Sequence, residues 1–413
     1  HHTFVTGNAS RNLDTWMMGE DVCRELFERS AASADISVIE GVMGLYDGSI
    51  DSSGDGSSAH LAKVLNTPVI LVVNVKGAAQ SAGAVVMGFR EFDKEVNLAG
   101  VILNNIASES HYECVKTAIE ESCSVAVLGY LNKDSDITIP ERHLGLIPSE
   151  EKKVSSDLYD KLGQMVIETI DTDRLQEIAG SPGDFPDYNK SIFINRDSSL
   201  EVTLAIARDS AFCFYYQDDI DLFESMGAEI KLFSPLADKS LPDGIDGIYI
   251  GGGFPELFAE RLMKNESMRS SIVEAYKQGA VIYGECGGMM YLLEKLIDCD
   301  GRSFKMSSVH NGTSKMEKRR QGLGYVIVDV ICDTVISRKG DTFRAHEFHW
   351  SGLQDIPEST FFAYNTMKSN GKRTGVDGIC KGNILASYTH IHFSSNPALA
   401  KNMLSSMAER VQI

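Results

Sequence analysis

The sequence contains no uninterrupted apolar run of the roughly 20 residues that a membrane-spanning helix needs, and no charged-then-apolar leader opens it. Basic residues are scarce, because 39 Lys and Arg stand against 58 Asp and Glu and leave a formal net charge of −19. This charge disfavours nonspecific attraction to phosphate backbones and anionic lipid headgroups. We therefore expect small-molecule substrates, no nucleic acid or membrane partner, and a cytoplasmic location.

The sequence also lacks any CxxC pair, and its eight cysteines are too scattered to form a disulfide framework. Most of them are expected to be small core residues in a reducing compartment. Apolar residues make up 43% and charged residues 23%, as in packed water-soluble proteins. A length of 413 residues allows two domains with separate cores. The oligomeric state is undecided, and a homodimer is one assembly left open.

Short β-branched runs alternate with longer helical patterns along most of the chain. Buried strands are predicted at 36–39, 69–75, 99–103 and 125–130, and again at 202–207, 229–233, 247–250, 280–283, 324–330 and 384–387. This alternation is typical of parallel sheets covered by helices. The expected fold class is α/β, with two doubly wound domains at 1–178 and 200–413, and a linker at 179–199 that includes a Gly/Pro/Asp-rich stretch.

One cysteine has a distinctive local setting. The segment AVIYGECGGMMYLL, residues 280–293, predicts a strand, a tight turn and a helix, with Cys286 at the turn. Glycines at 284, 287 and 288 allow a strained turn and close backbone approach, and the positive end of the following helix favours a thiolate. A buried structural cysteine is the alternative, but the flanking glycines favour a nucleophile.

A thiolate that attacks a carboxamide also needs a base. His390 and His392 follow the last predicted strand, and period-two geometry places both on one face. One of them as base, oriented by a second polar residue, fits the logic of a catalytic triad. Structural or substrate-facing histidines and a two-histidine metal site are the alternatives, and metal ranks last because no third ligand has a suitable spacing.

The same chemistry needs donors for a developing oxyanion. A glycine run follows the predicted strand at 247–250, and the backbone N–H groups of Gly252 and Gly253 are candidate donors beside the N–H of Gly287. Three glycines alone are a weak signal, but their position one strand before Cys286 strengthens it.

Together the motifs GIYIGGGFPELFAERL, YGECGGMMYL and SYTHIHFSSNP resemble the class I glutamine amidotransferase domain of cobalamin-pathway amide synthases, with the cobyrinate a,c-diamide synthases the best fit. The resemblance implies that Cys286 forms a glutamyl thioester and that His390 assists it. Ordinary class I domains carry a glutamate two residues beyond that histidine, where this chain has His392. The segment RAHEFHWS, residues 344–351, matches too and is read as a substrate or domain-interface loop, with a metal site as the alternative.

The first half resembles the same family through RNLDTWMM, VIEGVMGLYDG and GVILNNI. These synthases are similar to dethiobiotin-synthetase-like P-loop proteins, which phosphorylate a carboxylate with ATP before ammonia attacks it. The resemblance implies ATP as co-substrate, Mg²⁺ as cofactor, and cobyrinate and glutamine as the other substrates. Residues 1–178 are accordingly expected to form the synthetase domain.

Five residues of the first half are site candidates. Glu40 follows the predicted strand at 36–39, where a Walker-B-type carboxylate would hold Mg²⁺, and a surface acid is the alternative. Tyr46 and Asp47 stand in a Gly-rich loop beyond that strand, where open α/β sheets bind ligands, although Asp47 also suits an ordinary turn. Asp14 and Arg11 are lower-ranked substrate candidates that a surface salt bridge would explain equally well.

The family's Walker A loop, GxxxxGK followed by Ser or Thr, is absent: the only Gly-Lys dipeptide is Gly371-Lys372, and Arg373 follows it. The chain thus resembles the family with its first strand and phosphate loop removed. We expect glutaminase chemistry with impaired ATP-driven ligation. A nickel-sirohydrochlorin a,c-diamide synthase is the nearest alternative, and a nucleotide-switch or scaffold protein with a retired glutaminase domain is the alternative from another class.

Overall fold

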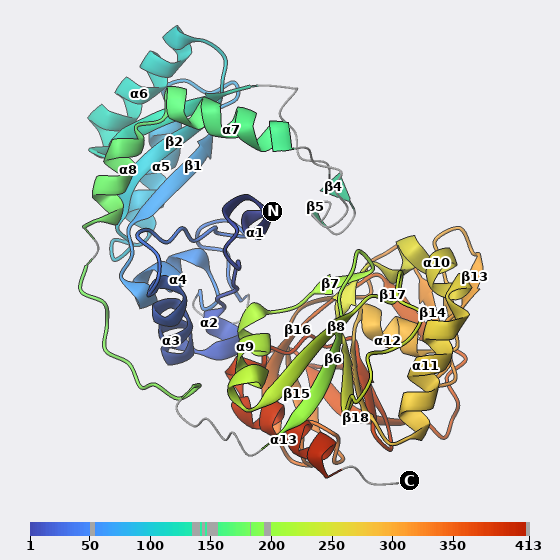
Figure 1. Cartoon of the computed structure of the whole chain (residues 1–413). Coiled ribbons are helices and arrows are strands. Elements are labelled where there is room, and N and C mark those ends of the chain that lie inside the picture. Colours follow the sequence, from blue (N-terminus) through green and yellow to red (C-terminus); the bar gives the residue numbers. More distant parts are fainter. Residues whose placement is uncertain are drawn as a thin grey trace. The chain divides into compact units, whose positions relative to one another are not determined.

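A computed structural model describes residues 1–49, 54–133, 141–142, 145–146, 156–181, 183–193 and 200–409. The chain divides into two compact units (Figure 1). Unit 1 comprises His1–Asn8 and Cys23–Asn189, and unit 2 comprises Ala9–Val22 and Lys190–Ile413. This division differs from the expected boundaries, because residues 9–22 belong to the second unit. Residues 182 and 194–199 of the expected linker lie outside the described residues.

Unit 1 has a parallel sheet of β1 (Val69–Asn74), β2 (Leu98–Ile106) and β3 (Val127–Asn132), in that order among the described residues. Apolar residues from these strands pack with α5 and α6 into one core cluster, which includes Val86, Leu103 and Ile119. The helices of the unit are α1 (His2–Thr6), α3 (Glu20–Ala31, whose first three residues belong to unit 2), α4 (Ser58–Leu65), α5 (Ser81–Phe92), α6 (Glu109–Cys123), α7 (Ser156–Thr169) and α8 (Thr172–Ala179). Two short strands, β4 (Glu141–Arg142) and β5 (Gly145–Leu146), pair separately.

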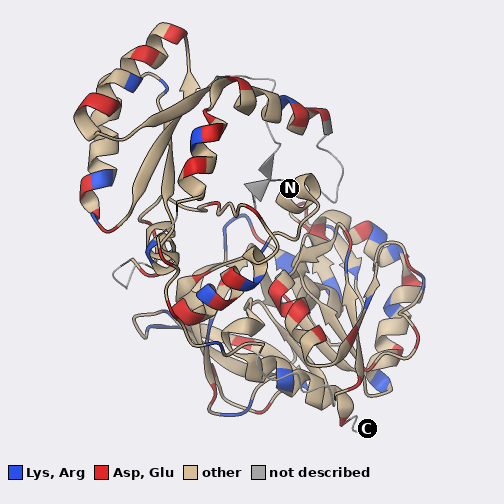
Figure 2. Ribbon diagram, turned by 60° about the vertical axis from the view of Figure 1, so that its left-hand side comes forward, with Lys and Arg blue, Asp and Glu red and all other residues tan. Residues whose placement is uncertain are grey.

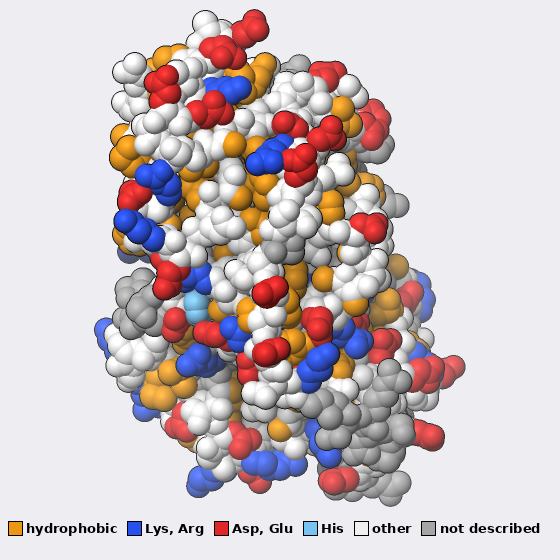
Figure 3. Space-filling view, turned by 90° about the vertical axis from the view of Figure 1, so that its left-hand side faces the viewer, with side chains coloured by type: hydrophobic (Ala, Val, Ile, Leu, Met, Phe, Trp, Pro, Cys, Tyr) orange, Lys and Arg blue, Asp and Glu red, His pale blue; other side chains and the backbone are white. Residues whose placement is uncertain are grey.

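The predicted strand at 36–39 is wrong. These residues have no strand pairing and expose apolar side chains, since Ile36, Val38 and Ile39 are 46%, 91% and 40% exposed. A strand that is apolar on both faces forms only when strands and helices cover it, and among the described residues β1 is an edge strand that does not pair with this run. Other apolar side chains of unit 1, such as Val72 and Phe92, are also exposed, and Figure 3 shows hydrophobic side chains among the charged ones at the surface.

Unit 2 is built on a mixed sheet with nine strands in the described part of the chain, in the order β16-β15-β18-β19-β20-β11-β9-β6-β8. The half from β8 to β20 is parallel and the half from β20 to β16 is antiparallel. The strands of this sheet are β6 (Val202–Ala207), β8 (Ala228–Phe233), β9 (Gly247–Ile250), β11 (Val281–Glu285), β15 (Gly322–Val330), β16 (Thr342–His349), β18 (Phe361–Met367), β19 (Arg373–Lys381) and β20 (Ile384–Ser387). The parallel half carries five of the strands predicted from apolar runs, and the predicted strand at 324–330 is β15 in the antiparallel half.

Two apolar clusters cover the two faces of this sheet. Successive residues of β6 alternate between them, with Leu204 and Ile206 in one and Ala205 and Ala207 in the other, as strand geometry requires. On the first face lie α9 (Gln217–Ser225) and α13 (Pro397–Ala408), and on the second lie α10 (Ala259–Lys264), α11 (Glu266–Lys277) and α12 (Gly287–Leu292) (Figure 1). Many Asp and Glu residues, red in Figure 2, stand along the helices.

The remaining elements of unit 2 are short. They are α2 (Thr15–Met18), β7 (Phe212–Phe214), β10 (Gly252–Gly253), the 3-10 helices η2 (Pro255–Phe258) and η3 (Phe393–Ser395), β12 (Lys295–Ile297), β13 (Ser303–Lys305), β14 (Thr313–Met316) and β17 (Ser351–Gln354). No helix in the described ranges is long and apolar enough to span a membrane.

Candidate active site

Cys286 lies at the turn between β11 and α12, as the sequence predicts. Its backbone has φ 50° and ψ −101°, a conformation that is costly for a residue with a Cβ and that is typical of a nucleophile elbow. The turn is closely packed, because a Cβ on Gly288 would overlap the carbonyl oxygen of Ile250. The Cys286 amide donates to the carbonyl of Ser387 at 2.7 Å and anchors the turn to the end of β20. The chain therefore holds the thiol on a strained, fixed backbone.

His390 is the base candidate that reaches this thiol. The Cys286 side chain is close enough to shift the pKa of His390 upward, and Nδ1 of His390 lies 2.8 Å from Oε1 of Glu285. The backbone of His390 is held by a two-way bridge to His346 on β16, with N–H to carbonyl distances of 2.8 and 3.1 Å. Thiol, imidazole and carboxylate thus form a chain of three buried groups.

The electrostatics of His390 follow from these neighbours. Burial alone would lower the pKa of the imidazole, but the negative charges of Cys286 and Glu285 outweigh it and raise that pKa well above its usual range. The protonated form of His390 is therefore stabilised by these two neighbours.

His392 does not share this site. β20 ends at Ser387, so the two histidines do not lie on a strand with one common face. The His392 ring lies against Tyr216, and its Nδ1 is 3.2 Å from Oδ1 of Asp219. Burial lowers the pKa of His392 to about 3, so the ring is neutral in the core. Neither ring nitrogen of His392 has a hydrogen-bond partner within the described part of the chain, whereas the ring of His390 pairs with Glu285.

The three glycines proposed as oxyanion donors converge beside Cys286. A Cβ on Gly252 would lie 3.0 Å from Cε1 of His390, and one on Gly287 would lie 3.1 Å from the nitrogen of Gly253. Gly287 is the first residue of α12, where an amide has no acceptor within its own helix. The glycines therefore place backbone close to the reacting groups, with no room for side chains.

The segment 344–351 is a strand for most of its length, so its expected loop structure is wrong. Residues 344–349 lie in β16, where pairing with β15 fixes their register, and Ser351 begins β17. The carbonyl oxygen of Phe348 lies 4.0 Å from the Cys286 sulfur, and His349 stacks on Tyr388 at 3.8 Å. No group of three or more His, Cys, Asp or Glu suited to a metal occurs among the described residues. This strand forms one wall of the Cys286 site.

Unit 1 carries a separate cleft of about 500 Å³ at the carboxyl ends of β1, β2 and β3. Parallel α/β sheets bind ligands at this edge. Asn105, in the left-handed region with φ 65°, donates to the side chain of Asn74 at 3.1 Å and stands beside the start of α6. The cleft is lined by Lys76, Gly77, Asn105, Ile106, Ala107, Ser108, Glu109, Tyr130, Asn132 and Lys133.

Comparison with known proteins places both units in one family. Residues 203–398 match the CobB/CobQ-like glutamine amidotransferase domain, and residues 6–141 match an AAA domain. The cobyrinate a,c-diamide synthase of Listeria monocytogenes is 44% identical over 98% of this chain and 89% of its own length. Those of Priestia megaterium and Methanothermobacter thermautotrophicus are each 40% identical over 97% of this chain, and over 86% and 89% of their own lengths. The chain belongs to the cobyrinate a,c-diamide synthase family.

The metal position expected for this family member is not formed around Glu40. With no strand at 36–39, Glu40 lies in an exposed coil, and its carboxylate pairs with Nε2 of His2 at 2.6 Å. The described residues offer no acidic cluster that would hold Mg²⁺ there. Residues 36–39 do not form the strand that was expected to place this carboxylate at the sheet edge, and the role of Glu40 in holding Mg²⁺ remains a prediction.

Tyr46 and Asp47 lie in unit 1, in a loop attached to α4 and α5. The Tyr46 hydroxyl donates to the carbonyl of Phe89 at 2.6 Å, and its ring packs against Phe92. Burial raises the pKa of this phenol. The Asp47 amide closes a turn to the carbonyl of Gly44 at 2.9 Å, and its side chain is exposed. The turn at Asp47 matches its structural alternative, and the substrate role of both residues remains a prediction.

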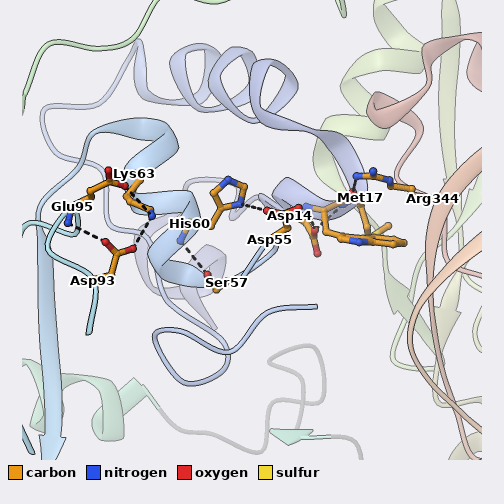
Figure 4. A network of polar contacts seen from close by, with 10 residues as sticks. Asp14, Met17, Asp55, Ser57, His60, Lys63, Asp93, Glu95 and Arg344 are labelled. Atoms are coloured by element: carbon orange, nitrogen blue, oxygen red, sulfur yellow. Dashed lines mark hydrogen bonds and ion pairs between the residues drawn. The ribbon is translucent and has the colours of Figure 1, made fainter. Parts of the chain in front are cut away.

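Arg11 and Asp14 belong to unit 2, in the segment Ala9–Val22, which we call the strap. Arg11 forms ion pairs with Asp218 and Asp221 of α9, and its distance to Asp221 is 2.8 Å. Asp14 caps α2 by accepting from the amides of Trp16 and Met17 at 2.9 Å (Figure 4). These two candidates therefore make contacts that hold the strap in unit 2.

Two functional features of this family member escape the sequence. Glu285 is one residue before the nucleophile, and its acidic side chain in the sequence Gly-Glu-Cys-Gly-Gly is the signal that could have found it. The cleft of unit 1 includes Asn105 of the motif GVILNNI, whose polar end was a signal of the same kind. Both depend on partners that are distant in the sequence.

Proposed function

We propose that this chain is an ATP- and glutamine-dependent ligase that amidates the a- and c-carboxylates of cobyrinate. Relatives with that name match this chain over nearly its whole length, and the observation that carries the proposal is Cys286 on a strained turn next to the His390–Glu285 pair. The AAA domain match supports ATP use in unit 1. A scaffold protein would not need the strained nucleophile that unit 2 retains.

The first reaction takes place in unit 2. The Cys286 thiolate attacks the side-chain carboxamide carbon of glutamine, and backbone amides of the glycine turns stabilise the resulting oxyanion. The tetrahedral intermediate expels ammonia, which takes its third proton from the His390 imidazolium, and a glutamyl thioester remains. Water, deprotonated by His390, then hydrolyses the thioester to glutamate and restores the thiol.

The second reaction uses the ammonia. Transfer of the γ-phosphoryl group of ATP to a carboxylate converts its oxygen into a leaving group, and ammonia displaces phosphate to form the amide. The cleft at the carboxyl ends of β1–β3, with Lys76 and Lys133 on its wall, is the proposed nucleotide site. ATP ordinarily enters such reactions with Mg²⁺, which we propose as the metal, and we propose the cytoplasm as the compartment.

Glutamate release from glutamine tests the first reaction directly. The chain should release glutamate, and a glutamine-like diazo-ketone should alkylate Cys286 alone, as read by peptide mass spectrometry. Cys286→Ser should lose glutamate release, while any amide formation driven by ammonium salt should persist. Glutamate release that survives Cys286→Ser would refute the nucleophile, and tighter binding of nickel-sirohydrochlorin than of cobyrinate would refute the proposed substrate.

A further inference from the structure

Glu285 is the acid that contacts the catalytic imidazole. Its Oε1 lies 2.8 Å from Nδ1 of His390, and the two side chains are only 3% and 13% exposed. Because Nδ1 faces this carboxylate, Nε2 is the ring nitrogen left to receive the thiol proton of Cys286. The carboxylate thus selects the tautomer in which His390 can accept the thiol proton.

The carboxylate of Glu285 is itself held from two sides. The hydroxyl of Tyr283, also on β11 and fully buried, donates to Oε2 at 3.0 Å. The amide of Ile391, the residue after the base, donates to the same oxygen at 3.3 Å. These two donors leave Oε1 for the imidazole and fix the carboxylate in one orientation. Such support is what an orienting group needs in a triad.

The position two residues beyond His390 cannot take this role. His392 is buried against Tyr216 and paired with Asp219. Burial also raises the pKa of Asp219 well above its usual range. Among the described residues, Glu285 is the carboxylate hydrogen-bonded to the base.

We propose that Glu285, the residue immediately before the nucleophile, is the positioning residue of the triad, in place of a carboxylate beyond the histidine. It accepts the Nδ1–H hydrogen bond and stabilises the imidazolium while the Cys286 proton resides on Nε2, and it does not itself take the proton. The inference deepens the proposed function and rests on it, because it presupposes that Cys286 is the nucleophile.

Glu285→Gln tests the inference with a side chain of nearly the same size. We expect kcat for glutamine hydrolysis to fall by about 10²- to 10⁴-fold, as for other triad acids, with KM changed little. The pH midpoint for alkylation of Cys286 by iodoacetamide should also move upward, because the imidazolium that favours the thiolate is lost. A merely structural role would reduce the amount of folded protein without moving that midpoint.

Asp219→Asn is the matched control, because it makes the same acid-to-amide change beside the other histidine. It should leave both the midpoint and kcat within a few-fold of the wild type. Tyr283→Phe, a milder change, keeps the carboxylate and removes one of its donors, so kcat should fall by about two- to tenfold. These measurements use the whole chain.

Wild-type kcat and an unmoved midpoint in Glu285→Gln would overturn the inference, as would a shifted midpoint in Asp219→Asn alone. If Glu285→Gln does not fold, wild-type kcat in folded Tyr283→Phe overturns it. These results differ from the one that would refute the proposed function. That result is glutamate release by the Cys286→Ser protein.

Discussion

The Tyr325 hydroxyl donates a hydrogen bond to Oδ2 of Asp14 at 2.7 Å, which joins the strap to β15. The same two segments stack Trp16 on the Tyr325 ring at 4.4 Å. Arg344 of β16 lies over the indole and donates to the carbonyl of Trp16 at 2.7 Å. A segment near the start of the chain is therefore an integral part of unit 2, although the residues that follow it belong to unit 1.

Asp14→Ala tests whether Asp14 is structural or binds substrate. The change removes a helix cap and the acceptor for Tyr325, so unit 2 should lose about 1–3 kcal/mol of stability. Glutamine hydrolysis per folded molecule should stay near the wild-type rate. Urea unfolding followed by Trp fluorescence measures the first effect, and Asp47→Ala, at an exposed side chain, is the control. A stable Asp14→Ala protein with a raised KM for cobyrinate would instead support the substrate role.

The features of unit 2 that depend on residues close together in the chain could be predicted from the sequence. The strand at 202–207, the strand at 247–250 and the strained turn at Cys286 are encoded by residues that are neighbours in the chain, so apolar runs and glycines sufficed to predict them. The parallel half of the sheet in unit 2 followed from the same runs.

The remaining features depend on distant partners. The proposed role of Glu285 depends on its hydrogen bond to His390, which lies 105 residues later in the chain. The strap depends on Tyr325, which is 311 residues from Asp14. The strand predicted at residues 36–39 is wrong because it lacks a distant partner. An apolar run becomes a strand only when a neighbouring strand pairs with it.

Glu347 makes the stability of unit 2 depend on pH. Burial, aided by the nearby charge of Asp377, raises the pKa of this carboxyl to about 7. The native state therefore binds its proton more tightly than the unfolded chain, and stability falls as pH rises from about 4.5 to about 7. Glu347→Gln does not titrate, so its stability relative to wild type should increase through this window by on the order of 1–2 kcal/mol. Urea unfolding at several pH values checks this, and a difference independent of pH would contradict it.

Lys76→Met tests the cleft of unit 1. Lys76 is on the wall of the cleft, where a cation would attract nucleotide phosphates. Removing its charge should weaken ATP binding by about three- to tenfold, measured by isothermal titration. Lys116→Met removes a lysine that packs over Tyr112 on α6 and is not on the cleft wall, so it should bind ATP normally. Equal affinities for wild type and Lys76→Met would place the nucleotide elsewhere.

Gly288→Ala tests the close packing behind the nucleophile. The added Cβ would overlap the carbonyl oxygen of Ile250, a backbone atom of β9 that cannot move without disturbing the sheet. We expect a loss of at least about 3 kcal/mol in stability, or no folded protein. The added Cβ overlaps a backbone atom, and no change of side-chain rotamer can relieve that overlap. Gly375→Ala, on β19, is the control, since a Cβ there meets nothing within 4 Å. It should change stability by less than about 1 kcal/mol, because a strand accepts alanine at such a position. Wild-type stability and glutamate release in Gly288→Ala would mean that α12 shifts freely and that the turn is not held as the structure has it.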